Sequence, residues 1–191
     1  ADFTAGQAPP LATQVGGASV LVNGNAVPLF YTSYGQIAFQ IPVDAAPGSA
    51  TIQVQRDDGT ISNKAGIEIV PRAPRLLVAV NLNNSVNSAT APAKPGEVLT
   101  IYAVGLGATT PDVGSGAPAP SAEPLARVSA PVFVAFGTGI VKSIAEPFYA
   151  GLTPTFAGLY QINVSIPPDA STGAMDLTVS VGETASNALT L

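Results

Sequence analysis

The sequence lacks most of the side chains that carry out catalysis in proteins. It has no His, no Cys and no Trp among its 191 residues. Without His or Cys, a chain cannot build a Ser-His-Asp triad, a cysteine nucleophile, a disulfide, or a zinc or haem site with thiolate or imidazole ligands. The sequence therefore predicts that the protein is not an enzyme, and it predicts no catalytic residue, no cofactor and no metal site.

Carboxylates and glycine-rich turns are the remaining candidates for chemistry. Asp57-Asp58-Gly59 could be part of a calcium loop, but neighbouring residues on a hairpin do not converge on one ion, which favours a turn. Asp44 and Asp169 each follow a repeated strand phrase, which favours turn formers over a glycosidase-like pair. Gly105-Leu106-Gly107 lacks the third glycine and the helix of a phosphate loop, and is predicted to be a turn that ends a strand.

Aromatic side chains could instead line a sugar-binding surface. Most of them alternate within predicted strands, so the core is their expected location. They are Phe30, Tyr31, Tyr34, Phe39, Phe133, Phe136, Phe148, Tyr149, Phe156 and Tyr160.

The charge pattern limits the classes of partner. The formal net charge is −5 and the seven cations are scattered from Arg56 to Lys142, which excludes the basic patch that nucleic acid requires. No run of about eighteen apolar residues is present, so no membrane-spanning helix is expected. A start of Ala1-Asp2-Phe3 and a cysteine-free chain are typical of a mature bacterial protein after export, and we expect the protein to be secreted, outside the cell or on its surface.

Apolar and polar residues alternate in the segments that must position any site. In Gln36-Ile37-Ala38-Phe39-Gln40-Ile41-Pro42 the three large apolar residues share one face, which predicts a half-buried strand. The phrase returns as Gln161-Ile162-Asn163-Val164-Ser165-Ile166-Pro167. Other pairs match in the same order: Pro10-Leu11-Ala12 with Pro124-Leu125-Ala126, Phe30-Tyr31 with Phe148-Tyr149, and Ser62-Asn63 with Ser186-Asn187. The chain is therefore interpreted as two copies of one β unit.

Short strands between Gly, Pro and Asn turns predict the fold class. It is all-β, with two tandem immunoglobulin-like β-sandwiches, residues 1–71 and residues 72–191, joined at Pro71-Arg72-Ala73-Pro74. Residues 108–124, rich in Pro and Gly, are expected to form a long loop inside the second sandwich.

The two copies differ at their beginnings. The second copy has an apolar strand at Val98 to Val104, predicted to be central, ahead of its Pro124-Leu125 phrase. Only residues 1–9 precede Pro10-Leu11, so the first sandwich is predicted to lack this core strand. Such a gap exposes unpaired backbone groups, so another segment must supply the strand.

Several phrases resemble a known family. They are Leu21-Val22-Asn23-Gly24, Pro28-Leu29-Phe30-Tyr31, Gly35 to Pro42, Pro92 to Glu97, Ile101 to Gly107 and Gly158 to Val164. Together they resemble the C-terminal module of secreted proteins of Acidobacteria, notably Solibacter, which is related to the IPT/TIG immunoglobulin-like sandwiches. The resemblance implies secretion and an immunoglobulin-like fold, and it carries no catalytic residues.

Two functions fit these observations. The first is a structural subunit that polymerises head-to-tail with copies of itself into a surface filament, with Asp2, Phe3, Thr4 and Ala5 of one subunit as the strand added to its neighbour. The low content of charged residues, 10%, and a mean hydropathy of +0.37 favour it. The alternative is a stalk, adhesion or glycan-binding module from a larger secreted protein, with extracellular glycans as partners.

Overall fold

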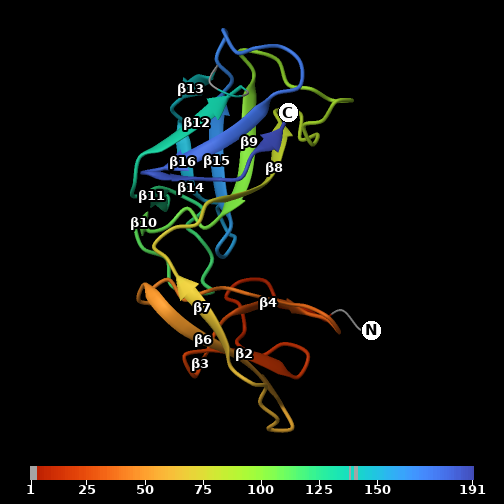
Figure 1. Ribbon diagram of the computed structural model, residues 1–191, viewed down its shortest axis with the longest axis vertical. Coiled ribbons are helices and arrows are strands. Elements are labelled where there is room, and N and C mark those ends of the chain that lie inside the picture. The colour runs from red at the N-terminus through yellow and green to blue at the C-terminus, as the bar shows by residue number, and fades with distance from the viewer. Residues whose placement is uncertain (1–3, 138, 140–141) are drawn as a thin grey trace. The chain divides into compact units, whose positions relative to one another are not determined.

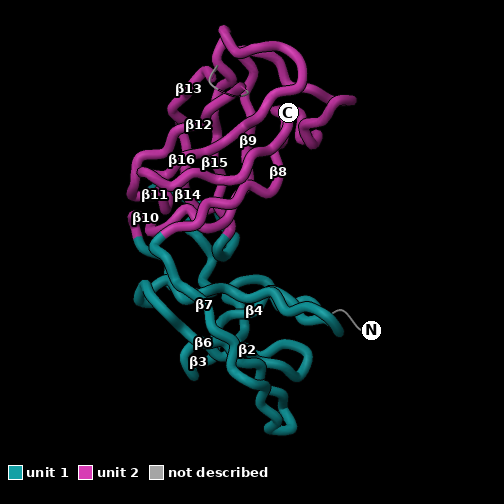
Figure 2. Tube along the Cα trace, in the orientation of Figure 1, with its two compact units in different colours: residues 1–71, 112–123, 154–158 teal, residues 72–111, 124–153, 159–191 magenta. Residues whose placement is uncertain are grey.

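The structure is a computed structural model that describes residues 4–137, 139 and 142–191. The described residues form strands, turns and loops and contain no helix. They divide into two compact units, coloured separately in Figure 2. The prediction of an all-β chain with two immunoglobulin-like sandwiches is confirmed.

The second unit consists of residues 72–111, 124–153 and 159–191 and contains two antiparallel sheets (Figure 1). One sheet has six strands in the order β10-β11-β14-β15-β9-β8. Their bounds are β8 Arg75–Asn81, β9 Val98–Val104, β10 Thr109–Thr110, β11 Arg127–Val128, β14 Tyr149–Leu152 and β15 Tyr160–Ser165. The other sheet has the order β13-β12-β16-β17, and β18 also pairs with β16. Their bounds are β12 Val132–Phe136, β13 Ser143–Ala145, β16 Asp176–Val181, β17 Thr184–Ala185 and β18 Leu189–Thr190.

Alternate residues of these strands build the core of the second unit. On β9, Leu99, Ile101 and Ala103 are fully buried, and they lie beside the equally buried Ile162 and Val164 of the neighbouring strand β15 in one core cluster. Strand β9 lies between β8 and β15, as its apolar sequence predicts.

The first unit has the same two layers with fewer strands. One sheet has the order β1-β4-β5, and the other has the order β3-β2-β6-β7. Their bounds are β1 Thr4–Ala5, β2 Ala18–Val22, β3 Asn25–Ala26, β4 Leu29–Thr32, β5 Ile37–Phe39, β6 Gly48–Arg56 and β7 Ala65–Ile69. Its core contains Val20, Val22, Val27, Leu29, Ala50 and Ile69.

Residues 112–123 and 154–158 also belong to the first unit, beyond the expected range of 1–71. Within that unit, the Gly116 amide donates to Gln40 Oε1 at 2.7 Å, and Leu11 donates its amide to the Gly116 carbonyl at 2.9 Å. The Ala119 amide donates to the Phe156 carbonyl at 3.0 Å and connects the two segments. Residues 108–124 were expected to form a loop of the second sandwich. Residues 112–123 of this stretch instead pack as part of the first unit.

Candidate strand-acceptor site

The outer edge of β5 is the main candidate site. In the second unit the corresponding strand, β15, pairs with β14 on one side and with β9 on the other. In the first unit β5 pairs with β4, and no strand of the described residues lies along its other edge. The predicted gap in the first sandwich therefore lies beside β5.

The apolar face of β5 shows the consequence of the gap. In the second unit, where β9 covers the edge, Ile162 and Val164 have 0% of their surface exposed and Ile166 has 3%. Their counterparts in the repeated phrase, Ile37, Phe39 and Ile41, are only half-buried. The same sequence pattern thus completes one core and leaves the other open.

Backbone hydrogen bonds differ between the units in the same way. The Ile166 amide donates to the Glu97 carbonyl at 2.8 Å, and its carbonyl accepts from the Gly96 amide at 2.9 Å. No residue of the described chain bonds to the backbone of Ile41, the counterpart of Ile166. A free amide and a free carbonyl next to half-buried apolar side chains are what an added strand requires.

The expected donor segment is only partly described. Asp2 and Phe3 lie outside the described residues. Thr4 and Ala5 form β1, which pairs with β4 of its own unit, with Thr4 opposite Thr32 and Ala5 opposite Tyr31. In the order β1-β4-β5 this pairing is on the other side of β4 from β5. A copy that donates this segment must first release it from β4.

The acidic candidates lie in turns. The Asp58 carboxylate accepts a hydrogen bond from the Thr60 amide at 2.8 Å, and the hydrogen bonds from Thr60 lower the pKa of this carboxyl. Asp44 and Asp169 occupy matching turns in different units. Gly105 and Gly107 follow β9 with positive φ angles of 74° and 94°, as a strand-ending turn requires. The acidic residues therefore lie in the turns that the sequence predicts, and Gly105 to Gly107 form a loop that ends β9.

The aromatic residues are divided between core and surface. Phe136 and Tyr149 are buried, in agreement with the sequence-based expectation. Five others are exposed, and for these the expectation of a core position was wrong: Phe30, Tyr34, Phe133, Phe148 and Phe156. Tyr34 and Phe156 lie outside the strands, and Phe148 directly precedes β14, so period-two alternation does not decide which way they point.

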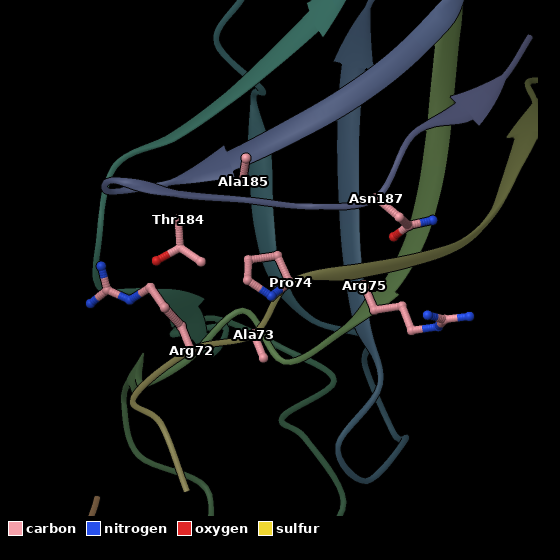
Figure 3. Close-up of a pocket in the computed structure, with 7 residues that line it drawn as sticks. All are labelled: Arg72, Ala73, Pro74, Arg75, Thr184, Ala185 and Asn187. Carbon is pink, nitrogen blue, oxygen red and sulfur yellow. The ribbon is translucent and has the colours of Figure 1, made fainter. Parts of the chain in front are cut away.

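An open hollow of about 440 Å³ lies in the second unit (Figure 3). It is lined by Arg72, Ala73, Pro74, Arg75, Thr184, Ala185 and Asn187. The two arginine side chains point in opposite directions in Figure 3, so they do not converge on one anion. Arg72 donates Nη1 to the Val181 carbonyl at 3.5 Å, which ties the start of the unit to β16.

A second hollow, of about 200 Å³, exposes an aromatic ring. Phe148, with 60% of its surface exposed, lies in it together with Arg127 and Glu146. The Arg127 guanidinium lies 5.1 Å from the centre of the Tyr149 ring, a cation–π distance that holds the side chain in place. An exposed ring beside charged groups can stack on a sugar and donate hydrogen bonds to it.

Comparisons with known proteins name no relative: no family model, no curated protein and no solved structure matches this chain. Over the ranges that the structure describes, no helix has the length and apolar character needed to cross a membrane. Within the same ranges, no three acidic side chains cluster in a way that could hold a metal ion.

Proposed function

We propose that the chain is a non-enzymatic structural protein of an extracellular assembly, and that its first unit works as the acceptor of an added β-strand. The observation that carries this proposal is the open edge of β5, where Ile37 and Phe39 of the strand and the following Ile41 are only half-buried. Main-chain hydrogen bonds to such an edge provide affinity, and apolar side chains of the added strand provide specificity.

Burial of apolar surface would drive the addition of the strand. Fully burying a Phe or Ile side chain stabilises a protein by about 1.5–3 kcal/mol, and Ile37, Phe39 and Ile41 have part of that burial still to gain. Completion of the backbone ladder also removes an edge that could otherwise pair with unrelated chains. The first unit is therefore expected to be more stable after strand addition than alone.

The proposed assembly is a surface filament in which a neighbouring copy supplies the strand. Such a contact joins two different surfaces, so it repeats head-to-tail. The resemblance to modules of secreted acidobacterial proteins and the cysteine-free chain support an extracellular location.

Mass measurement and imaging test this proposal. The purified full chain is expected to form elongated particles in negative-stain electron microscopy, and to have a mass by light scattering that grows with concentration. A chain without residues 1–7, or with Phe3→Asp, should be monomeric if the N-terminal segment is the donor, while the second unit stays folded. A full chain that is monomeric at all concentrations would refute the filament.

A stalk or glycan-binding module is the second candidate function. The observation in its favour is the hollow with the exposed Phe148 beside Arg127 and Glu146. Isothermal titration calorimetry with soluble polysaccharides tests this glycan-binding function. Binding that Phe148→Ala abolishes would support this function, and the absence of binding by the wild-type chain would remove it.

A further inference from the structure

One side chain of the second unit holds an edge strand by its backbone. Asn187 follows β17, and its Oδ1 accepts the Leu76 amide of β8 at 2.8 Å. Its Nδ2 donates to the carbonyl of the same Leu76 at 3.3 Å. A carboxamide that pairs with both polar groups of one residue acts as a short strand, so Asn187 clamps β8 to the neighbouring sheet.

The turn that carries Asn187 is repeated in the first unit. Ser186 Oγ accepts the Val179 amide at 2.9 Å and donates to the Asn187 carbonyl at 2.7 Å. Ser62 Oγ accepts the Val54 amide at 3.0 Å and donates to the Asn63 carbonyl at 2.9 Å. The two matching hydrogen bonds therefore hold Asn63 in the same kind of turn as Asn187.

The partner of this second asparagine is missing from the described chain. The Asn63 side chain is exposed, and no described residue forms a hydrogen bond with its carboxamide. The first unit has no described counterpart of β8, just as it has none of β9. The free carboxamide and the open edge of β5 are two separate signs of the same absent element.

We propose that Asn63 is a backbone clamp for the element that completes the first unit, and that this element is a pair of strands with the pattern of β8 and β9. The proposal rests on the strand-acceptor function above. It adds that the occupant must have a residue with a free amide and a free carbonyl opposite Asn63, in the place of Leu76.

The geometry of the second unit explains why a single strand is insufficient. There, the strand that pairs with β15 is β9, whereas the strand that Asn187 holds is β8. A short segment such as Thr4–Ala5 can occupy one of these positions at most. The edge of β5 and the clamp are both satisfied only by two adjacent strands.

The order of the repeat identifies the source of the pair. In the second copy, β8 and β9 come ahead of the Pro124-Leu125 phrase. The same order in the first copy places the occupant ahead of Pro10-Leu11, on the same polypeptide. The occupant is therefore a segment of the β8–β9 pattern joined ahead of this phrase. This source replaces the neighbouring copy of the filament model, and both sources use the open edge of β5 as the acceptor.

A fusion protein tests the proposal with the full chain. A copy of residues 75–107 is placed ahead of residue 1, and amide exchange is followed by NMR in the chain and in the fusion. The fusion is expected to slow the exchange of the Ile37, Phe39 and Ile41 amides by about tenfold or more, since the gained hydrogen bonds must open first. The carboxamide protons of Asn63 should become protected in the fusion alone.

Variants of the clamp separate the inference from the function on which it rests. Asn63→Leu and Asn63→Asp should return the three amides of the fusion towards the rates of the unfused chain, whereas the neighbouring Lys64→Ala should not. Protection that survives both Asn63 variants would overturn the clamp and leave the strand-acceptor function standing.

Two further results would be decisive. If the unfused chain protects the same amides when it self-associates, and the fusion does not, the occupant comes from a second copy and our assignment of its source is wrong. If neither protein protects them at any concentration, the acceptor function itself fails.

Discussion

Removal of the Asn187 side chain is the sharpest test of the comparison between the two units. In Asn187→Ala, the Leu76 amide loses its acceptor, and Leu76 is only 3% exposed, so water cannot replace the bond fully. A buried donor left without a partner costs about 1–3 kcal/mol, and the longer bond from Nδ2 adds a smaller amount. We therefore expect the free energy of unfolding of the second unit to fall by about 2–3 kcal/mol.

The matched control is Asn63→Ala in the unfused chain. Asn63 lies in the same kind of turn, but its side chain has no hydrogen-bond partner among the described residues. The free energy of unfolding should therefore change by no more than about 0.5 kcal/mol, as for other exposed positions. The chain contains no Trp, so peptide-resolved hydrogen exchange with mass spectrometry is a better assay than intrinsic fluorescence. A loss of 2 kcal/mol corresponds to about a thirtyfold faster exchange in β8 and β9. Equal effects of the two alanine variants would refute the proposed difference between the units.

Three other substitutions probe separate features. Ile166→Pro removes an amide that donates to the Glu97 carbonyl at 2.8 Å, and it should lower the free energy of unfolding of the second unit by about 1–3 kcal/mol. Ile41→Pro should lose a comparable hydrogen bond only after a strand has been added, and urea unfolding monitored by circular dichroism compares the two variants. Burial raises the pKa of the Tyr160 hydroxyl above 10.0. The unfolded chain therefore ionises first as the pH rises above 10.0, so the stability of the folded chain is full below that pH and falls above it. Tyr160→Phe should make this fall less steep in melting curves measured over a series of pH values. Gly116→Ala, at φ +74°, would place a methyl group 3.0 Å from Pro28 and should destabilise the first unit by about 1–3 kcal/mol, and unchanged exchange in β4 would contradict this.

The sequence predicts the strands well where one face is buried. The alternation of Ile162, Val164 and Ile166 places all three in the core, as period two requires. The repeat also predicts that the first sandwich lacks a core strand, because no counterpart of Val98 to Val104 comes ahead of Pro10-Leu11. The structure then places this gap beside β5. The degree of burial of Ile37 and Phe39 cannot be predicted in this way, because it depends on the segment that covers β5 and not on the sequence of β5.

The sequence does not predict which unit residues 112–123 join. Their bonds to the first unit, such as that from the Gly116 amide to the Gln40 side chain, connect positions far apart in the chain and have no periodicity. The Ser62-Asn63 match could have revealed the clamp, but its meaning depends on the contact between Asn187 and β8, which lie at opposite ends of the second unit's sequence. Local pattern shows that the turn repeats, and only the tertiary structure shows what the turn holds.

The discontinuous first unit affects the order in which the protein can fold during synthesis. Residues 4–71 leave the ribosome first, yet residues 112–123 of the same unit follow only after β8, β9 and β10 of the second unit, and residues 154–158 only after β14. The first unit therefore cannot close as soon as it emerges, although domains usually fold in that order. Expression of residues 1–71 alone would leave Gln40 and Leu11 without their partners on Gly116, so a cut at the apparent boundary should give an aggregation-prone fragment rather than a domain.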